Sequence, residues 1–233
     1  MTGDGVPTTP DGADAGRLVA ERWCEVCRDA TASSGAGITL VAHDRSTGTI
    51  CVTDDVTALC EELQFTLGEG PCLDAYDERR PVGEPDLGVM GGLRWPAFRA
   101  PAVAAGVRAA FGFPISVGSV RLGALDLYRD LPGPLTAPQH ADALRLADAA
   151  GVLILEAQAA ARPGRLGDAL AGAESFRLVV HQAAGMIAAQ LDVPVVDALL
   201  RLRAHAFVHD VAVADVAREV VGRRLRFDEG DRR

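Results

Sequence analysis

The chain has 233 residues, a formal net charge of −9 and a hydrophobic content of 48%, which together indicate a soluble globular protein with one large domain or two small ones. All 23 of its Lys-plus-Arg positions are arginine, and the negative total opposes unselective binding to nucleic acid, which depends on a positive field. No uncharged apolar run approaches the ~18 residues of a membrane span, and the polar start lacks the pattern of a signal peptide, so we expect a cytoplasmic protein with a disordered tail over residues 1–14.

Residues 15–162 combine helical and strand patterns. In chain order, we expect a helix at 15–31, strands at 37–43 and 49–53 joined by a loop at 44–48, a helix at 57–67, a short helix at 72–77, an extended segment at 81–82, a helix at 96–105, strands at 106–117 and 120–128, and a long helix at 136–161. The apolar spacing of the first helix predicts that its buried side carries Leu18, Val19, Trp23, Val26 and Cys27. Antiparallel strands interrupted by helices and closed by a long helix predict an α+β fold.

The cysteines are confined to the first third of the chain. Their number is odd and no secretion signal precedes them, so we expect no disulfide framework. Cys24 and Cys27 form a CxxC pair within an amphipathic helix, which favours core packing over zinc binding or a redox site. Cys72 begins a helix, and we interpret it as an inert turn cysteine rather than a reactive thiol. His43, at the end of a strand, is more typical of a half-buried residue than of a metal or haem ligand. The five positions are Cys24, Cys27, Cys51, Cys60 and Cys72.

This N-terminal region resembles a GAF domain. The resemblance rests on Gly68-Glu69-Gly70-Pro71-Cys72, Ala75, Pro81-Val82, Asp86-Leu87 and the paired strands between Val107 and Arg129. It implies an antiparallel sheet flanked by helices, over residues 15–162. GAF folds hold a small molecule between sheet and helices or serve only to dimerise, and the sequence leaves both alternatives open.

A break at Arg162-Pro163-Gly164 ends the long helix and predicts a linker over residues 163–173. The segment that follows, 174–228, predicts a small all-α domain of three short helices. The first is expected at 174–191, the second from Pro194 to about His209, and the third at about 213–225. Each carries an apolar stripe that a helix of this length cannot bury alone, so the three are expected to pack on one another or on a partner chain.

The order of residues in this segment resembles an ANTAR domain, the RNA-binding module of transcription antiterminators. The matching positions are Gln182-Ala183, Gly185-Met186, Ala198-Leu199, Leu202-Arg203, Ala206-Phe207 and Val216-Ala217. The family often has a lysine where this chain has Ala184, so a phosphate contact from that position is not expected here. The resemblance implies that a homodimer binds paired hairpins in nascent RNA and prevents a terminator from forming.

Polar residues between the apolar stripes are the candidate RNA contacts. Gln182 can read a base edge because its amide both donates and accepts hydrogen bonds, and Gly185, three residues later, lies on the same helix face. Gly185 carries a helix-propensity cost of about 1 kcal/mol relative to alanine, which is tolerated where a ligand or another backbone approaches closely. The predicted RNA-binding residues are Arg177, His181, Gln182, Gly185, Arg201 and Arg203.

His205 and His209 lie one helical turn apart, which suits a shared metal, but Arg201 one turn earlier would repel a cation. We therefore predict no metal and no cofactor. No GxSxG, Walker A, HExxH or Rossmann glycine pattern occurs, so we expect a regulator and not an enzyme. Two alternatives are a DNA-binding transcription factor and a ligand or redox sensor whose C-terminal helices bind protein. Apolar residues open the second and third helices, which argues against a recognition helix in the major groove.

Overall fold

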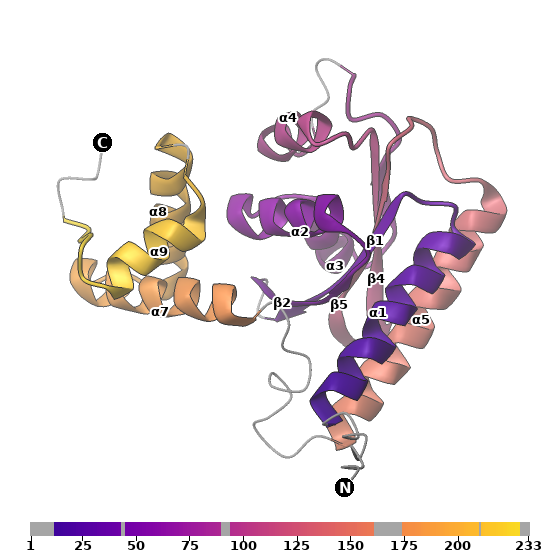
Figure 1. Cartoon of the computed structure of the whole chain (residues 1–233), viewed down its shortest axis with the longest axis horizontal. Coiled ribbons are helices and arrows are strands. Elements are labelled where there is room, and N and C mark those ends of the chain that lie inside the picture. Colours follow the sequence, from indigo (N-terminus) through magenta and orange to yellow (C-terminus); the bar gives the residue numbers. More distant parts are fainter. Residues whose placement is uncertain (1–11, 43–44, 90–93, 161–173, 210, 229–233) are drawn as a thin grey trace, which may run out of the picture.

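The computed structural model describes residues 12–42, 45–89, 94–160, 174–209 and 211–228. Five strands and the helices around them form an N-terminal unit, and three further helices form a C-terminal unit (Figure 1). In chain order the elements are α1 (Gly12–Ala30), β1 (Gly35–Ala42), β2 (Arg45–Val52), α2 (Asp55–Leu67), α3 (Pro71–Glu78), β3 (Val82–Glu84), α4 (Pro96–Ala104), β4 (Ala109–Val117), β5 (Val120–Arg129), α5 (Ala137–Ala160), α7 (Glu174–Leu191), α8 (Val195–Val208) and α9 (Val213–Val221).

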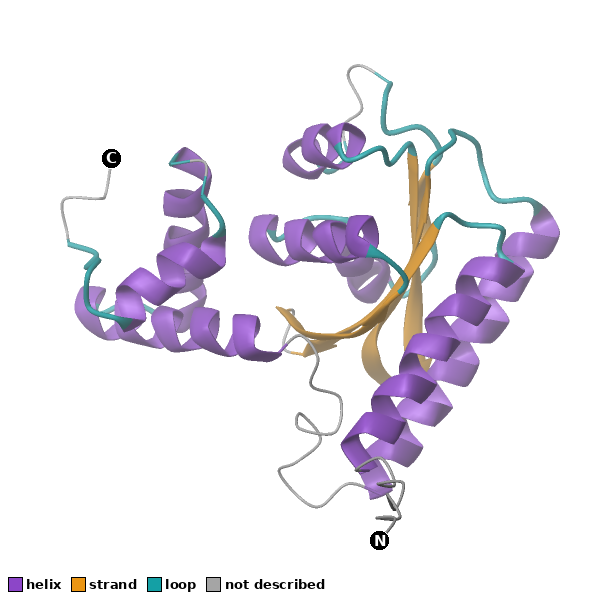
Figure 2. Ribbon diagram, in the orientation of Figure 1, coloured by secondary structure: helices purple, strands orange, loops and turns teal. Residues whose placement is uncertain are grey.

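The five strands make one antiparallel sheet in the order β2-β1-β5-β4-β3. Helices α1 and α5 cover one face, and α2, α3 and α4 cover the other (Figure 2). Apolar side chains fill the space on each side of the sheet. The α+β fold with a flanked antiparallel sheet, followed by a helical unit, is therefore confirmed. Within the described residues, none of the helices has both the length and the apolar character needed to cross a bilayer.

Several details of the N-terminal unit differ from the sequence-based expectation. Helix α1 begins at Gly12, so residues 12–14 of the predicted disordered tail 1–14 are helical. Strand β2 begins at Arg45, inside the predicted hairpin loop, because Ala42 pairs directly with Arg45. His43 lies outside the described residues. In α1, Leu18, Val19 and Val26 are 51%, 62% and 48% exposed, so their predicted burial is wrong. The helix packs through Trp23, Cys24 and Cys27 instead, which leaves an apolar face open.

The C-terminal helices pack on one another as predicted. Val180, Ala183 and Ile187 of α7 are fully buried, together with the stripes of α8 and α9. The chain turns between α7 and α8 at Asp192, whose φ of 50° lies in the left-handed region, and Pro194 caps α8. Helix α9 ends at Val221, earlier than the predicted 225. Arg224 then folds back onto Glu219 with two hydrogen bonds of 2.9 Å.

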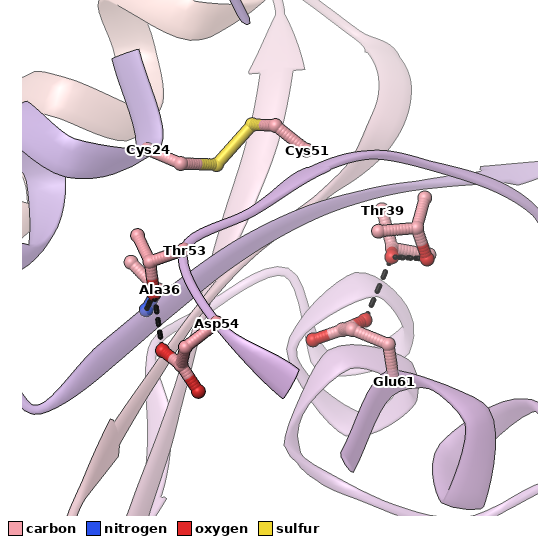
Figure 3. Close-up of a disulfide and its surroundings, with 8 residues drawn as sticks. Cys24, Ala36, Thr39, Cys51, Thr53, Asp54 and Glu61 are labelled. Atoms are coloured by element: carbon pink, nitrogen blue, oxygen red, sulfur yellow. Dashed lines mark hydrogen bonds between the residues drawn. A yellow bond between two sulfur atoms is a disulfide. The ribbon is translucent and has the colours of Figure 1, made fainter. Parts of the chain in front are cut away.

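The structure contains a disulfide that the cysteine count did not predict. Cys24 of α1 is bonded to Cys51 of β2, with 6.3 Å between their Cα atoms (Figure 3). Cys24 therefore pairs across the core with a strand, and not with Cys27 of its own CxxC. Burial raises the pKa of the Cys27 thiol to about 12, so this neighbouring thiol is poorly suited to exchange with the disulfide. An odd cysteine count excluded a fully paired set of cysteines, but not one local cross-link.

Replacing both Cys24 and Cys51 with alanine is expected to lower the free energy of unfolding by about 2–4 kcal/mol, because the unfolded chain loses a cross-link that closes a loop. Urea titration without reductant would measure the difference, and adding reductant should remove most of the wild-type advantage. Cys27→Ala is the matched control, because it removes a buried thiol and keeps the disulfide. Five free thiols in denatured, unreduced wild-type protein would contradict the cross-link.

Candidate RNA-binding face and a buried polar cluster

The predicted RNA contacts on α7 differ in their exposure to solvent. Gln182 and Gly185 are exposed, and a Cβ added at Gly185 would meet no heavy atom within 4 Å. Close helix packing therefore does not explain this glycine. Ala184 is fully buried and faces the core of the three helices. Arg177 lies in α7, but its side chain falls outside the described residues.

His181 and Arg203 face the N-terminal unit. Both contact Phe65 of α2, whose ring is 1% exposed and belongs to the apolar core of the C-terminal helices. The imidazole of His181 meets this ring edge-on, with 6.3 Å between the ring centroids and 74° between the planes. The guanidinium carbon of Arg203 lies 5.4 Å from the ring centroid, within the range of a cation–π contact.

The end of α2 explains why an arginine suits this position. Asp54 caps the start of the helix by accepting a hydrogen bond of 2.8 Å from the backbone N–H of Thr57. Gly68 ends it with a left-handed φ of 69°, and the last turn contains no basic residue. A guanidinium nitrogen of Arg203 lies 3.1 Å from the place that a Cβ on Gly68 would occupy. The C-terminal unit thus supplies the cation that favours the negative end of a helix dipole.

Arg201 lies on a different side of α8 from Arg203, because two residues turn a helix by about 200°. Arg201 is half-buried. On the same side His205 stacks on His209, with 4.1 Å between ring centroids, and also contacts Phe227. His209 Nδ1 lies 2.8 Å from the backbone oxygen of His205. Over the described ranges, no group of three or more His, Cys, Asp or Glu side chains is arranged to hold a metal ion.

A groove of about 750 Å³ runs beside the Phe65 contact, between the two units. Helices α2 and α4 form one wall, with Leu59, Leu63 and Pro101 among the lining residues. Phe207 and Val211 of the C-terminal unit lie on the other wall. Phe207 is 68% exposed. The two units therefore meet at the end of α2 without closing over the whole surface between them.

On its other side, α2 contributes to a buried polar cluster against the sheet that sequence analysis missed. Glu61 accepts hydrogen bonds from the Thr39 hydroxyl at 2.7 Å and the Tyr128 hydroxyl at 2.9 Å (Figure 3 shows the Thr39 bond). Gln64 donates to the Tyr128 oxygen and accepts from the backbone N–H of Cys72, both at 2.7 Å. The sequence signal for this cluster was Glu61 and Gln64, two polar residues three positions apart on a helix. A solvent-exposed helix face gives the same pattern, so the signal did not distinguish the two.

Asp126 is the unsatisfied member of this cluster. It lies on β5 between Gly37 of β1 and Gly112 of β4, which carry no side chain beside it. The residue is 0% exposed, and neither carboxyl oxygen accepts a hydrogen bond of good geometry. Burial and the charge of Glu61 raise the pKa of Asp126 well above its ordinary value, and the nearby Cys72 and Gln64 side chains oppose this only in part. The environment therefore favours a protonated, neutral Asp126.

The raised pKa sets a sign for the pH dependence of stability. At pH values between the ordinary carboxyl pKa of about 3.9 and the raised folded value, the unfolded chain loses a proton that the folded chain keeps. The contribution of Asp126 to the stability of the folded protein therefore falls as pH rises through that window.

The melting temperature of Asp126→Asn should be close to that of wild type near pH 4. It should exceed the wild-type value by a growing margin as pH rises towards 8, as measured by thermal unfolding. The exposed Asp148→Asn is the matched control. A difference between Asp126→Asn and wild type that stays constant with pH would contradict the assignment.

No protein-family model matches the chain, and no curated protein matches it. Several solved structures are similar to it. A GAF domain from a phosphoenolpyruvate-protein phosphotransferase of Coxiella burnetii has 16% identity and a TM-score of 0.47, covering 65% of this chain and 87% of its own. A GAF domain/HD domain protein from Geobacter sulfurreducens has 13% identity and a TM-score of 0.46, covering 63% and 97%. A type II free methionine-R-sulfoxide reductase from Thermoplasma acidophilum has 17% identity and a TM-score of 0.48, covering 63% and 96%.

Proposed function

We propose that the protein is a non-enzymatic regulator that binds hairpin loops in nascent RNA through α7 and α8 and prevents a terminator from forming. The observation that carries the proposal is the open surface over Gln182 and Gly185. A glycine without neighbours on a helix surface lets a ligand approach the backbone closely. An exposed amide beside it can pair with the base edges that RNA loops present.

The charge balance supports a selective contact over a purely electrostatic one. Between residues 174 and 227 there are seven arginines and six acidic residues. Two of these arginines are paired on the surface, Arg218 with Asp215 and Arg224 with Glu219. A nearly neutral surface gives little unselective affinity for a phosphate backbone, so binding would depend on side chains that read bases.

Replacing Gln182 with alanine is expected to weaken binding to a hairpin RNA by about ten-fold or more, the scale of a lost base-pair contact. Arg201→Ala should also weaken it. The measurement is a gel-shift titration of the full chain at fixed salt, using a synthetic RNA with two adjacent hairpins taken from transcripts that co-purify with the protein.

Arg218→Ala is the matched control, because it removes an exposed arginine on α9 and should change the affinity less than two-fold. Circular dichroism should show that each variant keeps its fold, since Gln182 is exposed. If Gln182→Ala and Arg201→Ala bind as well as wild type, the assigned face is wrong. If duplex DNA competes as effectively as the hairpin RNA, the protein is better explained as a DNA-binding regulator.

A homodimer fits this function because two linked binding units raise the avidity for paired hairpins. Helices α1 and α5 lie in contact on the outer face of the sheet (Figure 1). The apolar side chains that they leave exposed are Leu18, Val19, Val26, Leu144, Val152 and Leu153. Such a surface is typical of a protein–protein contact. We propose that this face joins two copies, with or without a small molecule bound to the N-terminal unit.

Val152→Arg places a charge on this face and is expected to shift the protein from dimer to monomer. Light scattering coupled to size-exclusion chromatography would measure the mass. Val152 is 50% exposed in one copy, so the change should not disturb the fold of the monomer. The control is Leu131→Arg, which alters a 63% exposed leucine on the loop after β5. A dimer that survives Val152→Arg would place the interface elsewhere.

A further inference from the structure

Phe65 contacts two of the side chains that are predicted to bind RNA. The imidazole of His181 meets its ring edge-on, and the guanidinium of Arg203 lies over the ring. These are the kinds of side chain on which unpaired RNA bases stack. Phe65 is 1% exposed and is buried within the apolar cluster of the C-terminal helices. Two of the six candidate contacts are therefore occupied by a residue of the same chain.

The two fully exposed candidates lie on the same helix as His181, close to it along the chain. Gln182 and Gly185 of α7 are exposed, while His181 is half-buried against Phe65. A hairpin loop approaching α7 would reach the open side and meet α2 at the edge of the site. Binding across the whole face would then require the end of α2, with Phe65 and Gly68, to move away from Arg203.

The contact has the form of a reversible docking. At the end of α2 it consists of an aromatic ring and a cation over the last turn of the helix, and α7 also contacts β2. Beside it, the groove lined by Leu63 and Phe207 remains open and is not a packed interface. Small, partly open interfaces between units of one chain permit relative motion. The N-terminal unit can thus release the C-terminal helices without unfolding either.

We propose that α2 masks the RNA-binding face through Phe65, so that the docked arrangement is the low-affinity state of the protein. This inference rests on the proposed RNA-binding function and names its regulation. RNA and Phe65 compete for His181 and Arg203, so whatever weakens the docking raises the affinity for RNA. Linkage makes the relation reciprocal. Bound RNA must therefore weaken the docking equilibrium between the two units by the same factor by which docking weakens RNA binding.

The first test removes the mask in the full chain. Phe65→Ala should raise the affinity for the two-hairpin RNA about five- to 100-fold, the usual range of coupling between sites, in a gel-shift titration at fixed salt. Phe65→Leu keeps an apolar side chain at this position and should give a smaller rise. Val56→Ala, on the same helix but 40% exposed and outside the groove, is the matched control and should stay within two-fold of wild type.

The second test locks the docked state, and it does not depend on the folding of any Phe65 variant. Thr66 and Phe207 line opposite walls of the same groove. Thr66→Cys combined with Phe207→Cys can be joined by a short bismaleimide, because the free thiols Cys27, Cys60 and Cys72 are buried. The cross-linked chain should bind the RNA at least five-fold more weakly than chains carrying either cysteine alone and the same reagent.

The outcomes separate the two proposals. Equal affinity of wild-type, Phe65-variant and cross-linked proteins for the RNA overturns the masking and leaves RNA binding intact. If none of these proteins binds the two-hairpin RNA, the proposed function is wrong and the masking falls with it. Stronger binding by Phe65→Ala, together with weaker binding by the cross-linked chain, is the result that the docked geometry predicts.

Discussion

Helix α2 is buried on two sides, and this double burial joins the two units of the chain. Its inner side directs Glu61 and Gln64 into a hydrogen-bonded cluster over the sheet. Phe65, the next residue after Gln64, enters the apolar core of the C-terminal helices. One helix therefore contributes side chains to two packed interiors.

The adjacency of these residues has a mechanical consequence. Gln64 is held at both ends of its amide, by the Tyr128 hydroxyl and the backbone of Cys72. Because Gln64 and Phe65 are consecutive in a rigid helix, the bonds that orient α2 on the sheet also fix where Phe65 meets the C-terminal helices. Asp126 lies in the same cluster with no hydrogen bond of good geometry to its carboxyl. A buried carboxyl group without hydrogen-bond partners destabilises the packing around it. Here that group lies in the cluster to which α2 contributes Glu61 and Gln64, on the side of the helix away from the C-terminal unit.

Sequence patterns predicted the order and type of the elements well, because apolar periodicity and turn residues are local signals. They placed α7 at its observed bounds and found the stripes that α7, α8 and α9 bury. They were less able to say what covers an apolar face. Leu18 and Val19 repeat like core residues, yet α1 turns them outwards. The Cys24–Cys51 bond was missed for a related reason, because pairing between a helix and a strand depends on tertiary distance and not on spacing.

The candidate site shows the same limit more sharply. Gln182 and Gly185 could be chosen from a single helix face, and they do lie together in the open. His181 and Arg203 were also expected on the outside of a three-helix unit, which holds only if that unit stands alone. An external aromatic ring changes the environment of both without altering any local pattern in α7 or α8.

In the proposed RNA-binding role, an acidic protein whose residues 174–227 hold seven arginines and six acids would gain little from attracting RNA at long range. Affinity for RNA would then come from short-range contacts. Each such contact that the protein itself covers would remove a large share of the total binding free energy. Under a strongly basic surface, hiding one arginine and one histidine would barely alter binding. Here Arg218 and Arg224 are already paired with acids of α9, so under the proposed masking the contact of Phe65 with Arg203 would have a large effect on RNA affinity.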